Sequence, residues 1–547
     1  MTLSFSRSLA PAALFAALVA GAPVLFAQEH EHASGSGRLG TVHFVTSCSE
    51  TAQPTFDRGV ALLHSFEFSR AIDAFEQTLK ADPSCGMAGW GIAMSRWSNP
   101  FGVGIRPPAQ LQKGLEAVER ANAAGAKTPR EHAYIDAVAK LYRDSDRIGQ
   151  HERLLAYRDA MGAAAERFPE DPEASIFYAL SLSASEEPTD KTYASRLKAG
   201  AILEKLFASQ PDHPGLAHYI IHSYDVPALA PKALDAASRY AKIAPDAPHA
   251  LHMPAHTFTR VGYWQESIDT NIASAAAARR DRATGEELHA TDYQMYAYLQ
   301  TAQDGAAKRL LDALPEMMSR FDPNSLGSAA PPAAGFFAYA AIPARWALER
   351  GAWTDAATLD PHPSPLPYAD AITYFARALG AARSGEAAGA RAAVDALQQL
   401  RDREEKMNEP FWTGQIEIQR RGAAAWLAFA EGRKQEAVDE MRKAAEAEDR
   451  TEKSAITPGP LAPARELLGE MLLEMNQPAQ ALKEFEATLT KEPNRFRALN
   501  GAARAAKLAG NQTAAAKYYA DLVRVCARAD RPGRPELQEA RRSTHAP

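Results

Sequence analysis

The chain has 547 residues, of which 46% are apolar and 23% are charged. This length exceeds what one ordinary core needs, so it predicts either several domains or a repeat array. A formal net charge of -6, with no cluster of Lys and Arg interleaved with aromatic residues, argues against a nucleic-acid partner. Alanine-rich stretches with few β-branched runs favour helix over strand.

The first residues have the pattern of a secretory signal peptide. Arg7 supplies a positive charge, Leu9 to Phe26 are largely apolar, and Ala27 places a small residue before a cleavage point. We therefore expect a periplasmic or secreted protein. No later stretch approaches the roughly 20 apolar residues that span a bilayer, so no membrane span is expected.

Two features follow near the expected mature start. His30 and His32 stand in a Glu-His-Glu-His stretch, which can capture copper or zinc, although a solvated leader is the commoner case. Cys48 and Cys85 flank the first expected helix pair. A disulfide between them would close a loop in the unfolded chain and raise the free energy of unfolding by about 4 kcal/mol. Two buried thiols fit the sequence nearly as well. Cys526 is then the free cysteine.

Fixed spacings recur at opposite ends of the chain. The pattern is a glycine, then an alanine, an aromatic residue and a proline at intervals of 12, 4 and 8 residues. It occurs at Gly59, Ala71, Phe75 and Pro83 and again, 410 residues later, at Gly469, Ala481, Phe485 and Pro493. Small residues let two antiparallel helices approach closely, the aromatic ring fills the gap, and proline ends the second helix.

The same pair of an alanine and a bulky residue recurs at 34-residue offsets near the C-terminus, at Ala515 and Tyr519, and at a matching place at Ala437 and Met441. This pattern resembles the tetratricopeptide repeat (TPR). The resemblance implies an all-α fold, in which helix-turn-helix repeats stack into a right-handed superhelical solenoid with a concave groove.

Proline and glycine are dense between Phe321 and Tyr368, which interrupts the helical periodicity around a helix pair expected near Phe336 to Leu359. We expect six segments. They are a signal peptide at 1–27, a flexible leader at 28–50, an N-terminal TPR-like array at 51–320, a junction at 321–370, a C-terminal TPR array at 371–530 and a flexible tail at 531–547.

Two adjacent repeats of the N-terminal array open alike. The tetrapeptides that end at Pro214 and at Pro248 both start Pro-Asp and lie 34 residues apart, and Asp before Pro indicates a capped helix start. Each helix then carries two histidines at the same places, in one case His218 and His222, and in the other His252 and His256.

This double pair predicts a metal site. Residues four apart lie on one helical face, so each pair can aim two imidazoles at one point, and neighbouring helices run about 8–10 Å apart. The TPR resemblance implies that these positions face the groove. Imidazole ligation suits Zn, Cu, Fe or Ni, and a cation would keep converging imidazoles neutral. The simpler alternative is histidines that hydrogen-bond in a wet groove without metal.

Further polar residues fall on the same stripe. His249 and His289 are secondary candidates for ligands. Asp225, Asp292 and Tyr296 are candidates for further ligands, for residues that orient the ligands, for a base, or for ordinary polar groups of the groove. His64 lies on the first expected helix, several repeats away, and is a distant candidate.

Pro254 falls inside the second His-bearing helix and should break or kink it, which weakens the geometry of His252 and His256. The segment from His249 to His256 also resembles histidine-rich exported bacterial TPR proteins. That resemblance supports the fold and implies no particular activity.

Three functions remain open from the sequence. The leading one is a metal-binding protein whose site could act on a small molecule, peptide or glycan held in the groove, which would make it an enzyme if one coordination position stays open. The second is a periplasmic scaffold that binds a peptide or an envelope or glycan-assembly partner without metal. The third is metal storage or delivery. Walker A, His-Glu-x-x-His, Gly-x-Ser-x-Gly and haem-attachment motifs are absent.

Overall fold

A computed structural model describes residues 37–102, 105–187, 189–325 and 329–544. All regular secondary structure in these ranges is helical, which confirms the predicted all-α class. The elements are α1 Gln53–His64, α2 Phe68–Ala81, α3 Gly86–Trp97, α4 Pro108–Ala124, α5 Pro129–Ala139, α6 Gln150–Arg167, α7 Pro172–Ala184, α8 Ala194–Ser209, α9 Pro214–Ser223, η1 Ala230–Ala233, α10 Leu234–Ile243, α11 Pro248–His252, α12 Pro254–Arg260, α13 Trp264–Arg280, α14 Thr284–Gln300, α15 Asp304–Ser319, α16 Pro332–Glu349, α17 Trp353–Ala357, α18 Pro367–Ser384, α19 Ala387–Lys406, α20 Pro410–Ala430, α21 Lys434–Asp449, α22 Ala464–Glu474, α23 Pro478–Lys491, α24 Phe496–Leu508, α25 Gln512–Val525 and α26 Pro535–Thr544.

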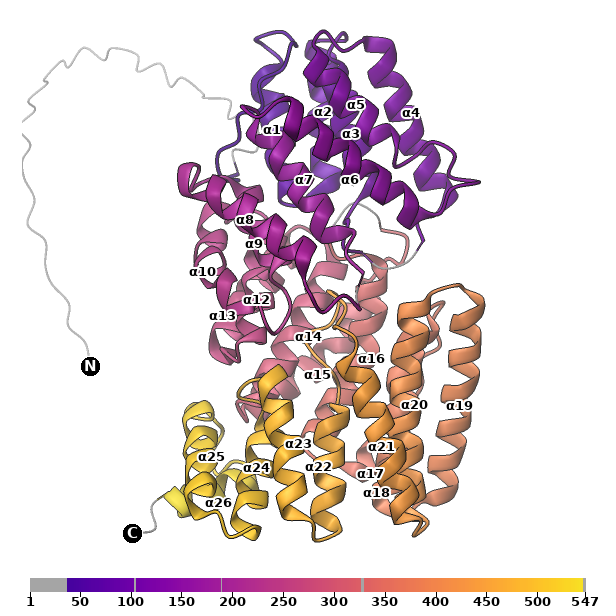
Figure 1. The fold of residues 1–547 in the computed structure, drawn as a ribbon, viewed down its shortest axis with the longest axis vertical. Coiled ribbons are helices and arrows are strands. Elements are labelled where there is room, and N and C mark those ends of the chain that lie inside the picture. The colour runs from indigo at the N-terminus through magenta and orange to yellow at the C-terminus, as the bar shows by residue number, and fades with distance from the viewer. Residues whose placement is uncertain (1–36, 103–104, 188, 326–328, 545–547) are drawn as a thin grey trace, which may run out of the picture. The chain divides into compact units, whose positions relative to one another are not determined.

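The helices stack in chain order as antiparallel pairs. Consecutive helices contact each other along most of the chain, and alternate helices such as α18 and α20 or α22 and α24 also touch. Figure 1 shows α18 to α23 side by side in this way. This is the helix-pair repeat that the TPR-like spacing predicts. Within the described residues, no helix combines the length and apolar character needed to cross a membrane.

Glycine and phenylalanine pack together at both ends of the stack. The buried ring of Phe75 lies against Gly59 in its own helix pair and against Gly91 in the next helix. The ring of Phe485 lies in the same way against Gly469 and Gly501. The recurring sequence pattern therefore corresponds to one recurring contact, in which an aromatic ring occupies the space that a side chain on the neighbouring helix would need.

Replacing Gly501 by alanine is expected to destabilise the C-terminal repeats by about 1–3 kcal/mol. A Cβ at this position would lie 2.4 Å from the Phe485 ring, so the ring or the helix must move. The matched control is Gly414→Ala, also inside a helix but with no atom within 4 Å of the new Cβ. That change should stabilise by about 0.5–1 kcal/mol. Denaturant unfolding followed by circular dichroism measures both; equal effects would contradict the packing argument.

The expected signal peptide, His30 and His32 lie outside the described residues. The described part of the expected leader differs from a flexible segment, because Phe44 is buried against the rings of Phe56, Trp90 and Tyr134. Cys48 and Cys85 form a disulfide, and Cys526 is free and buried.

The junction and the tail are also more regular than their composition suggests. Helix α16 contacts α14 on one side and α18 on the other, so the stack continues through residues 321–370. The expected flexible tail contains helix α26, which buries Leu537 and Ala540 against the neighbouring apolar cluster. An ion pair between Arg534 and Asp304 holds the start of this helix. Apolar burial and this ion pair order a segment whose sequence is mostly polar.

Candidate metal centre

Four helices supply the clustered histidines. Helix α9 carries His218 and His222, and it begins at Pro214 as predicted, although no side chain caps it. The second His-bearing segment breaks where Pro254 predicts: α11 ends at His252, and α12 starts at Pro254. Helix α14 carries His289.

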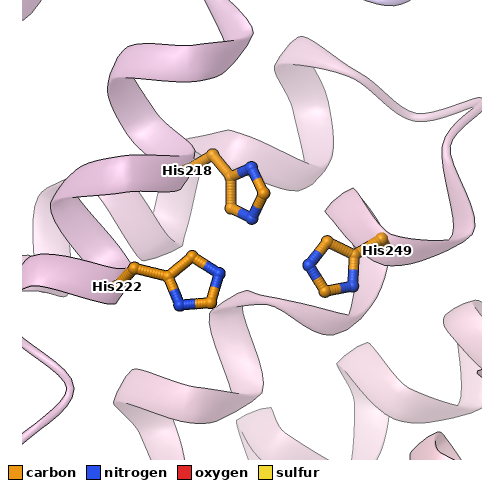
Figure 2. Close-up of side chains that lie close together, drawn as sticks. All are labelled: His218, His222 and His249. Carbon is orange, nitrogen blue, oxygen red and sulfur yellow. The ribbon is translucent and has the colours of Figure 1, made fainter. Parts of the chain in front are cut away.

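The first group consists of His218, His222 and His249. Each ring offers one nitrogen, and these atoms lie within 4.8 Å of one another. Figure 2 shows the three rings converging on a common space from two segments of the chain. The ring centroid of His218 lies 4.8 Å from that of His222 and 5.0 Å from that of His249. His249, predicted as a secondary candidate, thus completes a three-nitrogen set.

The second group consists of His252, His256 and His289, again with one nitrogen each within 4.8 Å of the others. The centroid of His252 lies 5.0 Å from that of His256 and 4.5 Å from that of His289. The four histidines of the predicted double pair are therefore divided between two groups. Each group gains its third member from outside that double pair.

The two groups adjoin. The centroids of His222 and His256 are 6.0 Å apart, and those of His249 and His252 are 6.1 Å apart. All six side chains are buried, with exposed fractions of 0 to 5%. This differs from the expectation that they line an open groove.

The cover over the second group comes from the segment 450–463, between α21 and α22. Its Lys453 pairs with Asp225, the carbonyl of Thr457 accepts a hydrogen bond from Tyr293, and the Ile456 backbone hydrogen-bonds His289. Aromatic rings cover the first group, where Phe101 stacks on His222 with a centroid distance of 4.0 Å.

Hydrogen bonds fix the proton on three of the rings. His218 Nδ1 donates to the carbonyl oxygen of His64 at 2.6 Å, and His256 Nδ1 donates to the Asp225 carboxylate at 2.9 Å. His252 Nδ1 donates to Asn271 Oδ1 at 2.6 Å, and the Asn271 amide is oriented by its own donation to Ser267. In neutral imidazole the other nitrogen, Nε2, then carries a lone pair. Such partners orient histidine ligands in metal sites.

The remaining ring nitrogens of the two groups have few hydrogen-bond partners; the Tyr293 hydroxyl lies 3.4 Å from His256 Nε2. His252 Nε2 and His256 Nε2 are 3.1 Å apart, and both are acceptors in the tautomers just described. His218 Nε2, His222 Nε2, His289 Nδ1 and both nitrogens of His249 are buried with no hydrogen-bond partner. Buried polar atoms are normally satisfied, so these nitrogens are unusual, and their lone pairs could ligate a metal ion.

Burial keeps the imidazoles neutral. It lowers the pKa of His218, His222, His252 and His289 well below the usual value, and neighbouring imidazoles lower it further. Burial also lowers the pKa of His256 to about 4, against the opposing effect of Asp225. Neutral imidazole is the form that binds metal, so protons compete weakly at neutral pH.

The three candidates for a base occupy different environments. Asp225 lies beside the second group and bonds His256, Arg260 and Lys453. Burial opposes its ionisation, but Lys453, Arg260 and His256 together lower its pKa well below the usual value, so it is a carboxylate that orients His256.

Asp292 and Tyr296 share α14 with His289 but do not bond to the histidine groups. Asp292 accepts from Arg345 Nε at 2.7 Å, and both side chains are fully buried. The Tyr296 hydroxyl accepts from Arg495 at 3.0 Å. Both residues therefore belong to ion-pair networks between α14 and the later repeats.

Sequence reasoning missed a third cluster, formed by His64, Glu173 and His213. The Glu173 carboxylate accepts from His64 Nε2 at 2.9 Å and from His213 Nε2 at 3.0 Å, and Tyr219 donates to His64 Nδ1 at 3.0 Å. Hydrogen bonds join all three side chains, although His213 Nδ1 has no partner, and the cluster holds the His64 segment whose carbonyl orients His218. Glu173 is 109 residues from His64 and follows no repeat spacing, so no local pattern indicated it.

A cavity of about 110 Å³ lies next to the second group. Arg260 and Lys453, which both bond Asp225, line its inner side, and Glu492, Tyr368 and Trp412 are among its other walls. A ligand in this cavity would be separated from His256 by the Asp225 carboxylate and its two cationic partners.

Fold and site together define an all-α protein of stacked TPR-like helix pairs with a buried centre of six histidines. No protein-family model matches the chain, and no curated protein matches it. Among solved structures, it is similar to the human IFIT1 dimer with m7Gppp-AAAA, with 14% identity over 81% of this chain and 90% of that one and a TM-score of 0.38. The human IFIT1 dimer with PPP-AAAA gives 13% identity, coverage of 77% and 87%, and a TM-score of 0.37. Likeness of this size carries no information about ligands.

Proposed function

We propose that the chain is a transition-metal protein whose histidine centre binds metal between its stacked repeats. One observation carries the proposal: His252 Nε2 and His256 Nε2 face each other at 3.1 Å while their Nδ1 atoms donate elsewhere. Two lone pairs at this distance repel each other, and the low pKa of both rings disfavours a shared proton. Metal–nitrogen bonds of about 2.0–2.1 Å place two ligand nitrogens of one ion at a similar separation.

The chemistry follows from the ligand count. Each group offers three neutral nitrogens, and three protein ligands leave a position open for water or substrate. An open position allows an ion to activate water or dioxygen, so we propose an enzyme that acts on a small molecule or peptide segment. A ligand in the adjoining cavity would reach the ion only where the contacts of Arg260 and Lys453 with Asp225 open. Burial makes loose storage or delivery the weaker alternative, because ions must exchange through a closed interior.

Export is part of this proposal. The pattern of residues 1–27 and the disulfide between Cys48 and Cys85 support an oxidising compartment, because disulfides are rare in reducing ones.

Elemental analysis of untagged protein tests metal binding. The parent should contain at least one tightly held transition metal per chain, whereas a variant with His218→Ala and His252→Ala should lose it. The matched control is His362→Ala, which changes an exposed histidine that stacks on Tyr339. Absence of stoichiometric metal in the parent, even after exposure to Zn, Cu and Fe under controlled redox conditions, contradicts the proposal and leaves a metal-free scaffold.

A further inference from the structure

We propose that the centre is dinuclear and holds two copper ions, one in each three-histidine group. This inference rests on the proposed function, and it adds the number, identity and coupling of the ions. It starts from the division of the six histidines into two complete sets of equal composition.

The geometry supports two ions rather than one shared ion. Within each group the donor atoms lie within 4.8 Å of one another, whereas no set in the described residues brings all six histidines together within that distance. Three ligands suffice to hold one ion, and a single ion has room for four to six ligands only if they all converge. Six nitrogens in two separate convergent sets therefore match two ions.

The ions would be neighbours. The closest rings of different groups are no farther apart than the most widely spaced rings of one group: the centroids of His222 and His256 are 6.0 Å apart, against 6.3 Å for His222 and His249. Ions held by these two adjoining groups would therefore occupy neighbouring sites, as do the two ions that act on one bound molecule in two-metal sites.

The donor set favours copper. Both groups consist of imidazole alone, without the carboxylate of the two-histidine, one-carboxylate set that is typical of non-haem iron. Copper stands at the top of the affinity order for divalent metals at nitrogen sites. Zinc shares the preference for imidazole, so the experiment must distinguish the two metals.

The charge of the site also favours copper. Two divalent ions would bring four positive charges into a buried region, which is costly without compensating anions. The carboxylates nearest the rings are Asp225, already paired with Arg260 and Lys453, and Glu286, whose Oε2 lies 3.9 Å from His249 Nδ1. Cu(I) halves this charge. Two Cu(I) ions that become Cu(II) would pass two electrons to one bound molecule of dioxygen, and the reduced oxygen would supply negative charge that offsets the added positive charge.

The test compares copper content with unpaired spins. Full-length protein is loaded anaerobically with Cu(I), freed of excess copper and oxidised in air. The parent should contain two copper ions per chain, with an electron paramagnetic resonance signal that accounts for less than about a fifth of them, because adjacent Cu(II) ions couple. Variants His222→Phe and His289→Phe each remove one ligand and keep an aromatic ring in the packing.

Each variant should bind one copper tightly, with a signal equal to about one spin per chain, and the His362→Ala control should behave as the parent. Circular dichroism and thermal unfolding establish that the variants are folded. One copper per chain in the parent, or two with a full uncoupled signal, overturns the dinuclear centre while leaving metal binding intact. A parent that binds zinc but not copper overturns the choice of metal. No metal of any kind overturns the proposed function as well.

Discussion

Copper or zinc added to the metal-free protein is expected to raise the free energy of unfolding of the central repeats by about 4 kcal/mol at a free metal concentration of ~1000 Kd. Only the folded chain presents the buried nitrogens of His218, His222, His252 and His256 as preformed ligands, so the metal stabilises the folded state. Scanning calorimetry of the loaded and metal-free protein measures the gain. Removal of the ion with a chelator should reverse it.

The control for this experiment is the His218→Ala and His252→Ala variant. It should melt at the same temperature with and without metal, because both groups are left with two ligands. An equal upward shift in the parent and the variant would mean that the metal acts elsewhere on the chain.

The repeat architecture could be predicted because the contacts that define it join residues close together in the sequence. The contact between Gly59 and Phe75 joins residues 16 apart, and the same contact between Gly469 and Phe485 repeats the spacing. Each helix pair buries its apolar face against the next pair, so short-range spacing is enough to define the class of fold.

The position of the histidines could be predicted, but their division into groups could not. Spacing of four residues correctly brings His218 close to His222 and His252 close to His256. The third member of each group depends on how neighbouring repeats cross: α11 places His249 beside His218 of α9, and α14 brings His289 to His252. These crossing geometries are tertiary properties that a one-dimensional spacing does not contain.

The segment that covers the histidine groups could not be predicted from the sequence. The segment 450–463 reaches the histidine region from about 200 residues away and has no periodic pattern. It combines single polar bonds such as Lys453 to Asp225 with apolar burial of Ile456 and Leu461, and it covers residues that the TPR resemblance places in a groove. The same segment explains the placement of Asp292, because Arg345 bonds both this carboxylate and the carbonyl of Gly459.

Replacing Asp292 by asparagine should therefore lower the free energy of unfolding by about 3–5 kcal/mol and leave the metal content unchanged. The substitution leaves the Arg345 guanidinium buried without its carboxylate, although Thr457 and Gly459 still accept hydrogen bonds from it. Denaturant unfolding and elemental analysis of the same preparations separate the two effects.

A double variant with Asp292→Leu and Arg345→Met is the matched control. It removes both charges, and loss of a whole buried ion pair costs much less than loss of one partner. Most of the stability should thus return, with the metal still bound. If Asp292 were instead a ligand or a base of the centre, the asparagine variant would lose metal or metal-dependent activity with little change in stability, and the double variant would not recover it. The ion pair with Arg345, between α14 and α16, favours the first outcome, because both carboxylate oxygens of Asp292 accept hydrogen bonds from this buried guanidinium.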